Sequence, residues 1–269
     1  MENQENDDKK PQLAPVQLGP NTEFKFDCHK DCSCFTECCR KIDIMLTPYD
    51  VIRMKKRLGL NSDEFLLLYT EVKLLKNTDM PVATLKLLDD ERESCPFVKD
   101  GEGCIIYEDR PTTCRYYPLG SASLSYTEEE TEEEDFFFMV EEPHCKGFDN
   151  DKTWSVDSWR THEGVIECDR VNDGWTNLLV RKKSIPSSVK LTEQSKKMFF
   201  DISYNTEKFR RFVFESTFLT VYKVEEEILE KIKEDDIALI EFGFDWLKFI
   251  LFQEGDFKKN EDVAAKRAK

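Results

Sequence analysis

Cysteine is concentrated in one short stretch near the start of the chain. Residues 26–40 read FDCHKDCSCFTECCR, which places five cysteines within twelve positions and makes the last two, Cys38 and Cys39, adjacent. Four more cysteines follow in the first half of the chain, at positions 95, 104, 114 and 145. Soft thiolate ligands select zinc, copper(I) or iron–sulfur clusters. This density of thiols therefore indicates a metal site or thiol redox chemistry.

The compartment decides how clustered cysteines are used. The N-terminal residues show neither an apolar run nor a cleavage pattern, so we expect no signal peptide. The most apolar segment, residues 237–252, contains three charged side chains and is too short to span a bilayer. We therefore expect a cytoplasmic protein, in which disulfides do not persist and clustered cysteines bind a metal or perform redox work. In an exported protein, the same cysteines would instead indicate a disulfide framework.

The adjacent pair limits how one metal centre can use the segment. Neighbouring side chains diverge on a helix and on a strand, so one ion rarely binds both Cys38 and Cys39. Two centres could share the segment, or one of the two thiols could be a bystander or a redox thiol. At four thiolates per centre, the first-half cysteines suffice for two centres. One centre with additional structural thiols fits equally well.

Other residues near the cysteines have both a functional and a simpler interpretation. His29 and His144 each neighbour a cysteine and could complete a site, but a surface histidine is the simpler interpretation. Arg110 and Arg115 flank Cys114 and could donate hydrogen bonds to ligating sulfurs, or form ordinary surface ion pairs. The last cysteine, at position 168, shares a helical face with two valines, and we expect a buried structural thiol there.

The elements that position these residues divide the chain into two kinds of structure. In the first half, a helix is predicted from its N-cap Thr47 to a stop at Gly59, and a short second helix is predicted with Ser62 as its cap. Strands are predicted at PVATLKLL, CIIY and DFFFMVE. The second half has helical periodicity throughout. Its expected helices follow Ser155, run from 165 to a break at Pro186, and span 192–203, 206–218, 224–233 and 235–252.

This pattern predicts an α+β fold, with a small cysteine-rich half that has a few short strands and a mainly helical C-terminal half. We expect a flexible lead at 1–20, a cysteine-cluster metal-binding domain at 21–150, a helical region at 151–254 and a polar tail at 255–269. An acidic insertion at 120–135 is interpreted as a solvated loop, with a metal- or partner-binding loop as the alternative.

Charge excludes two classes of partner. The chain has 39 lysines and arginines against 55 acidic residues, a formal charge of −16. A field of that sign repels phosphate backbones and anionic lipid, so we expect neither nucleic acid nor a membrane as a partner. The 20 phenylalanines and a hydrophobic content of 39% indicate a folded globular protein.

The segments CFTECCR, CPF, CIIYEDRPTTCRYYP and a later CKG also carry a family resemblance. Between Phe24 and Phe148 the chain resembles the YkgJ-type cysteine-cluster proteins, which contain a zinc- or iron-chelating domain, and flagellin lysine N-methylase contains a related domain. The motif is longer here and has an extra cysteine, so Cys32 is a candidate additional ligand. The resemblance implies these metal ligands: Cys28, Cys34, Cys38, Cys39, Cys95, Cys104, Cys114 and Cys145.

Three functions are compatible with these patterns. The first is a cytoplasmic protein that holds an iron–sulfur cluster or zinc through its cysteines. We favour the iron–sulfur cluster slightly because the cysteines are scattered singly rather than paired in zinc knuckles. The second is an enzyme, either a protein-modifying methylase like the flagellin enzyme or a thiol redox catalyst, although neither a glycine-rich cofactor loop nor a Cys-x-x-Cys motif is present. The third is an interaction scaffold stapled by zinc. A protein partner is expected only in some of these functions, and the sequence does not indicate an oligomeric state.

Overall fold

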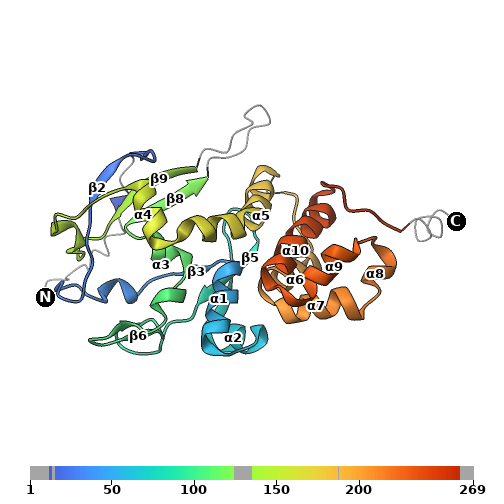
Figure 1. Cartoon of the computed structure of the whole chain (residues 1–269), viewed down its shortest axis with the longest axis horizontal. Helices are drawn as coiled ribbons and strands as arrows, with labels where there is room; N and C mark the ends of the chain where they lie inside the picture. Colours follow the sequence, from blue (N-terminus) through green and yellow to red (C-terminus); the bar gives the residue numbers. More distant parts are fainter. Residues whose placement is uncertain (1–11, 14–15, 124–134, 187, 261–269) are drawn as a thin grey trace, which may run out of the picture.

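The fold follows the predicted α+β organisation. The computed structural model describes residues 12–13, 16–123, 135–186 and 188–260. Antiparallel strands concentrate in the first half of the chain and helices in the second, which confirms the predicted fold class. Most of the strands lie towards one end of the longest axis and the C-terminal helices lie at the other (Figure 1).

Four small sheets form the first half of the protein. A central sheet has the strand order β3 (Met45–Leu46), β5 (Pro81–Leu85) and β4 (Thr70–Leu74). A second has the order β1 (Gln12–Leu13), β9 (Asp135–Glu141) and β8 (Leu119–Ser123). Two two-stranded sheets pair β2 (Glu23–Lys25) with the distant β10 (Thr153–Ser155) and β6 (Val98–Lys99) with the neighbouring β7 (Gly103–Cys104). These short pairings bring distant parts of the cysteine-rich segment together.

Ten α-helices lie in the described residues. Those of the first half are α1 (Pro48–Leu58), α2 (Ser62–Tyr69) and α3 (Thr112–Tyr116). Those of the second half are α4 (Val156–Glu163), α5 (Val165–Ser184), α6 (Glu193–Tyr204), α7 (Thr206–Glu215), α8 (Phe218–Val221), α9 (Glu226–Glu234) and α10 (Asp236–Phe252). The long helix α5 packs against α1 and α3 as well as α10, and so connects the two halves.

Local sequence signals predicted α1 correctly. The predicted cap of α2, the strand at CIIY and the end of the helix over 206–218 need correction. Thr47 and Asp50 form a reciprocal capping box, and Gly59 ends α1 with a φ of 68°. The cap of α2 is Asn61, not Ser62, because the Asn61 side chain accepts from the backbone N–H of Glu64 while Ser62 is already helical.

The predicted strand CIIY is wrong beyond Cys104, because the chain turns there into a 3-10 helix at Tyr107–Asp109. The helix expected over 206–218 ends at residue 215. The Ser216 hydroxyl donates to the carbonyl of Phe212 and accepts from the N–H of Phe218, which interrupts the helix before α8.

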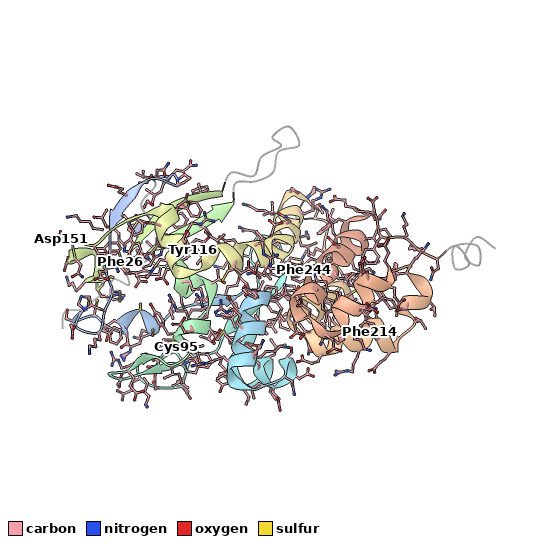
Figure 2. The ribbon with its side chains drawn as sticks, in the orientation of Figure 1. Phe26, Cys95, Tyr116, Asp151, Phe214 and Phe244 are labelled. Atoms are coloured by element: carbon pink, nitrogen blue, oxygen red, sulfur yellow. The ribbon has the colours of Figure 1, made fainter. Side chains whose placement is uncertain are left out.

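One apolar cluster runs through both halves. It combines Val82 on β5 with Phe199 on α6 and Leu239 on α10, and β5 packs directly against α6. A smaller cluster around Phe26 and Trp159 stabilises the region of β2, β8, β9 and α4. Figure 2 shows Phe26, Tyr116 and Cys95 in one half of the molecule, Phe214 in the other, and Phe244 near the middle. The shared larger cluster makes the helices part of the scaffold that supports the cysteine-rich half.

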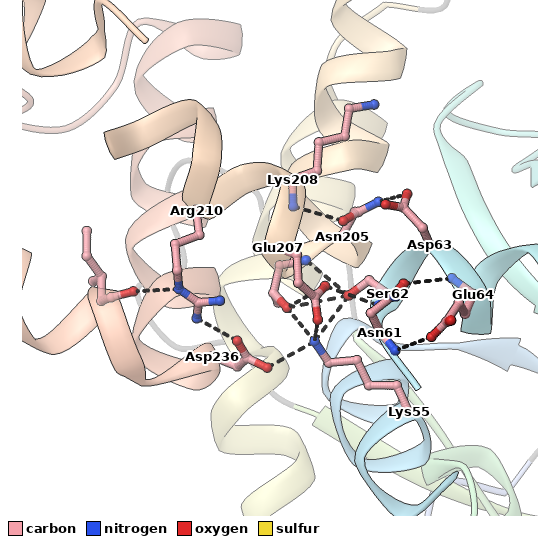
Figure 3. A network of polar contacts seen from close by, with 12 residues as sticks. Lys55, Asn61, Ser62, Asp63, Glu64, Asn205, Glu207, Lys208, Arg210 and Asp236 are labelled. Carbon is pink, nitrogen blue, oxygen red and sulfur yellow. Dashed lines mark hydrogen bonds and ion pairs between the residues drawn. The ribbon is translucent and has the colours of Figure 1, made fainter. Parts of the chain in front are cut away.

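A buried lysine reinforces this connection (Figure 3). Lys55 of α1 is 5% exposed, and its ammonium donates to Thr206 Oγ1 at 2.5 Å and Glu207 Oε1 at 2.8 Å. It also pairs with Asp236 Oδ2 at 3.0 Å, at the start of α10. Its hydrogen bond to the Ser62 hydroxyl at 3.2 Å completes the network. One cation of the cysteine-rich half therefore binds two helices of the second half.

The predicted flexible lead, acidic insertion and polar tail lie only partly within the described residues. Within the predicted flexible lead, Gln12 and Leu13 pair with β9, and the N–H of Leu18 donates to the carbonyl of Phe137 at 2.7 Å. Most of the acidic insertion, 124–134, and the end of the polar tail, 261–269, fall outside the described residues. Of the helices in the described parts, none combines the length and apolar character needed to cross a bilayer.

Candidate metal centre

A cavity of about 1220 Å³ gathers cysteines from five separate segments of the chain. Cys32 and Cys168 are not among its lining residues. The cysteines that line it are Cys28, Cys34, Cys38, Cys39, Cys95, Cys104, Cys114 and Cys145. These eight are the residues that the family resemblance implied as ligands. All ten cysteines of the chain are free thiols in the structure.

Backbone pairing brings the first cysteines of the chain to the segment around Cys145. The N–H of Phe26 donates to the carbonyl of Lys152 at 2.9 Å, and that of Asp27 donates to the carbonyl of Gly147 at 3.0 Å. A Cβ at Gly147 would lie 2.5 Å from the Phe26 ring, so this approach requires glycine. Next to Cys145, the N–H of Lys146 donates to the Cys34 sulfur at 3.1 Å. Cys28, Cys34 and Cys145 therefore share one region of the cavity wall.

A different set of contacts fixes the remaining cysteines. The N–H of Cys95 donates to the carbonyl of Cys39 at 2.8 Å. Cys104 lies opposite Val98 in the β6–β7 pair. Val98 follows Cys95 by three residues, so this pairing brings Cys104 towards Cys95. Cys114 is on α3, which begins where Thr112 donates twice to the buried Asp50 carboxylate, at 2.8 and 2.6 Å. α1 thereby holds the helix that carries Cys114.

The thiols line the cavity wall rather than meet at one point. Within the described ranges, no three cysteine, histidine, aspartate or glutamate side chains converge closely enough to coordinate one ion as they stand. The donor set is nevertheless rich in sulfur. A soft metal ion or an iron–sulfur cluster fits that chemistry better than a hard cation.

Burial and mutual repulsion disfavour thiolates in the cavity. Burial, with further contributions from neighbouring cysteines, raises the pKa of Cys28 to about 12 and that of Cys95 to about 11. The same causes raise the pKa of Cys114. Cys38 differs, because a hydrogen bond from Cys39 lowers its pKa and correspondingly raises that of Cys39. A bound cation supplies the positive charge that such a group of sulfurs needs in order to ionise.

The hydroxyl of Tyr117 is a buried donor beside the Cys145 sulfur. No atom of the described residues accepts a hydrogen bond from it at ordinary geometry. A buried polar group without a partner is costly, and a ligating thiolate is a strong acceptor. Tyr117 therefore fits a cavity in which the Cys145 sulfur is ionised by a metal.

Arg110 and Arg115, the two arginines expected near the cysteines, donate hydrogen bonds to backbone carbonyls around the cavity. Arg110 lines the cavity, stacks 3.8 Å from the centre of the Tyr107 ring and forms a buried ion pair with Glu163. Arg115 donates to the carbonyl of Arg110 at 3.1 Å and to that of Glu163 at 2.8 Å. Neither has a hydrogen bond to sulfur among the described contacts. Burial raises the pKa of Cys104, and the charge of Arg110 partly opposes that effect.

The other candidate residues, Cys32, Cys168 and His144, are not among the eight cavity thiols. The Cys32 thiol donates to the carbonyl of Asp27 at 3.8 Å and does not line the cavity. Cys168 is fully buried and donates to the carbonyl of Gly164, which confirms the expected structural thiol. His144 lines the cavity, but its Nε2 pairs with Glu142 at 3.1 Å.

Sequence reasoning missed one residue of the site, Tyr117. The only signal was its place three residues after Cys114 in the motif CRYYP. That spacing does not reveal its proximity to Cys145, because the contact depends on how α3 packs against the turn after β9. The structure therefore adds a hydrogen-bond donor to the candidate site of eight thiols.

Comparison with known proteins supports a chelating role for this part of the chain. Residues 27–152, a little under half of the chain, match the family model CxxCxxCC, described as a "Putative zinc- or iron-chelating domain". No curated protein and no solved structure matches the chain. The matched residues include all eight cysteines that line the cavity.

Proposed function

We propose that residues 27–152, which match the CxxCxxCC model of a zinc- or iron-chelating domain, hold an iron–sulfur cluster through the cavity cysteines. The observation that carries this proposal is the gathering of eight thiols, from five segments, around one cavity. The family description supports metal binding, and the choice of an iron–sulfur cluster rests on the chemistry of the site. We further propose that the protein acts in the cytoplasm, where thiols remain reduced.

Two features favour a cluster over a single zinc ion. Structural zinc sites close four ligands tightly around one ion, commonly with paired Cys-x-x-Cys knuckles. Here the cysteines come mostly from single positions and surround a cavity of about 1220 Å³. Iron–sulfur clusters are larger and are bound by cysteine thiolates. Zinc is the second candidate, because the family description names zinc and iron together.

When bound, a cluster supplies one-electron transfer or an iron that acts as a Lewis acid. The chain itself provides hydrogen bonds and an apolar wall. The N–H of Lys146 donates to the Cys34 sulfur, and the Tyr117 hydroxyl is available to donate to Cys145. Hydrogen bonds to the sulfurs and the exclusion of water set the reduction potential of such a centre. The helical half supports this site through the shared apolar cluster.

A thiol redox catalyst is the alternative activity. The lowered pKa of Cys38, caused by the hydrogen bond from Cys39, favours it because thiolates are the reactive form of cysteine. Thiol-disulfide exchange between Cys38 and a substrate would require the metal-free protein. Alkylation of metal-free protein, followed by a disulfide-reduction assay, tests this alternative. Turnover that is abolished in Cys38→Ser and retained in Cys168→Ser would favour it over a metal-holding role.

Purification under anaerobic conditions tests the proposed function. We expect a broad absorption band near ~400 nm, together with iron and acid-labile sulfide. Cys114→Ser should reduce the bound iron, whereas the matched control Cys32→Ser should retain the wild-type content, because Cys32 does not line the cavity. A colourless protein with stoichiometric zinc would support the second candidate. A protein with neither metal would contradict the proposal.

A further inference from the structure

We infer that metal binding draws the eight cysteines together into two separate four-thiolate centres that lie side by side. The outer centre comprises Cys28, Cys34, Cys38 and Cys145. The inner centre comprises Cys39, Cys95, Cys104 and Cys114. This inference rests on the proposed metal binding, and it adds the number of centres, the division of ligands and the order in which metal leaves them.

The outer centre is defined by contacts between two chain segments. Residues 26–34 lie against residues 145–152 through the Phe26–Lys152 and Asp27–Gly147 hydrogen bonds and through the bond from Lys146 to the Cys34 sulfur. Cys145 also packs against the smaller apolar cluster, the one that contains Phe26. Thiols in electrostatic range of Cys28 include Cys38, Cys32, Cys145 and Cys34. Of these, only Cys32 does not line the cavity.

The inner centre is associated with the larger apolar cluster. Cys95 is a buried member of that cluster, and Cys39, Cys104 and Cys114 pack against it. Cys39 and Cys95 are joined by a backbone hydrogen bond of 2.8 Å, and an isolated bridge pairs the next residue, Arg40, with Ser94. The two sets of cysteines thus belong to different parts of the core.

The adjacent pair lies at the boundary between the two centres. Cys38 and Cys39 end a 3-10 helix, in which successive side chains point about 120° apart. Cys39 is fixed to the inner set by its bond with Cys95. Cys38 is in electrostatic range of both sets: of the outer Cys28 and Cys145, and of the inner Cys95, Cys104 and Cys114. Because Cys39 already completes the inner set of four, we assign Cys38 to the outer set, and its contact with Cys39 makes the centres neighbours.

The two sets differ in their most exposed and most buried members. Cys28 of the outer set is exposed and Cys95 of the inner set is buried in the core at 8% exposure, while the other six thiols are partly exposed. All four inner thiols also belong to or pack against the larger apolar cluster. A chelator reaches the outer sulfurs first. We therefore expect the outer centre to exchange its metal readily, and the inner centre to retain metal until the larger apolar cluster opens.

Timed chelation of the wild-type protein tests this division. The metal-loaded full chain is treated anaerobically with a chelator, and samples are analysed for metal and alkylated for mass spectrometry. We expect two phases of similar amplitude, with alkylation in the first phase at Cys28, Cys34, Cys38 and Cys145. A single phase, or alkylation that includes both sets from the start, would overturn the inference. Cys32 reports alkylation of a thiol outside both centres.

A pair of variants provides an independent test. Cys28→Ser combined with Cys145→Ser should retain about half of the wild-type metal, with an unchanged circular dichroism spectrum. The matched control Cys32→Ser should retain all of it. Complete loss, or no loss, in the double variant would show that the eight cysteines do not form two independent centres. Wild-type protein that purifies without metal would instead refute metal binding itself, so the two failures are distinguishable.

Discussion

The buried network at Lys55 predicts a large loss of stability when that lysine is removed. Lys55→Met keeps a side chain of similar length but leaves Glu207 and Asp236 without their shared cation. Burial raises the pKa of Glu207, but hydrogen bonds from Lys55 and Ser62 outweigh that effect and lower it from 4.5 to about 2. At about 1.4 kcal/mol per pKa unit, this shift corresponds to about 3 kcal/mol.

Solvent reduces that figure, because the Glu207 side chain is 31% exposed and that of Asp236 is 27% exposed. Breaking a fully buried ion pair costs about 3–5 kcal/mol. For this partly buried network we expect Lys55→Met to lower the free energy of unfolding by about 2–4 kcal/mol. Urea unfolding at neutral pH measures the change, and Lys56→Met, at the next and exposed position of α1, is the matched control.

The effect also has a defined dependence on pH. Because the pKa of Glu207 is lowered in the folded protein, its contribution to stability is fully present above about pH 4.5 and is lost as the pH falls towards 2. The difference between wild type and Lys55→Met should therefore shrink across that range. Equal stability of the Lys55 and Lys56 variants at neutral pH would refute the proposed connection between the two halves.

Three further substitutions test separate features of the protein. Tyr117→Phe removes the donor beside Cys145, and we expect metal loss to a chelator to accelerate about tenfold while the metal-free protein keeps its stability; an unchanged rate would contradict a role for the hydroxyl. Gly243→Ala places a Cβ 2.7 Å from Ile202 and 2.8 Å from Phe209, so urea unfolding should show a loss of about 1–3 kcal/mol despite the better helix propensity of alanine. Equal or greater stability would show that α10 has room there. Cys168→Ala should keep the full metal content and cost about 1 kcal/mol, as expected for a buried structural thiol. Loss of metal in that variant would assign Cys168 to the site.

The elements that the sequence predicted well are those with strong local signals. The cap, the apolar spacing and the glycine stop of α1 are all within a dozen residues, and β9 has the predicted bounds. The strand predicted at CIIY was wrong because its apolar residues have strand propensity. The chain there instead turns into a 3-10 helix between Cys104 and Arg110. The stacking of Arg110 on Tyr107 belongs to that turn and has no local signal.

The candidate metal site, too, could be predicted only in part from local sequence signals. Cysteine spacing and family resemblance singled out the eight residues that line the cavity, but they left the number of centres open. The division between sets depends on hydrogen bonds between residues far apart in the sequence, such as Cys39 with Cys95 and Cys34 with Lys146. Such contacts are set by the packing of the sheets and helices, which a single sequence does not encode as a pattern.

The proposed function requires that the cavity cysteines ligate the metal directly. X-ray absorption at the metal edge of anaerobically purified protein measures the ligand atoms and their distances. We expect about four sulfur neighbours per metal at about 2.3 Å, with a second shell of metal neighbours if the occupant is an iron–sulfur cluster. A first shell of nitrogen and oxygen alone would contradict the account, because it would place the metal away from the eight thiols.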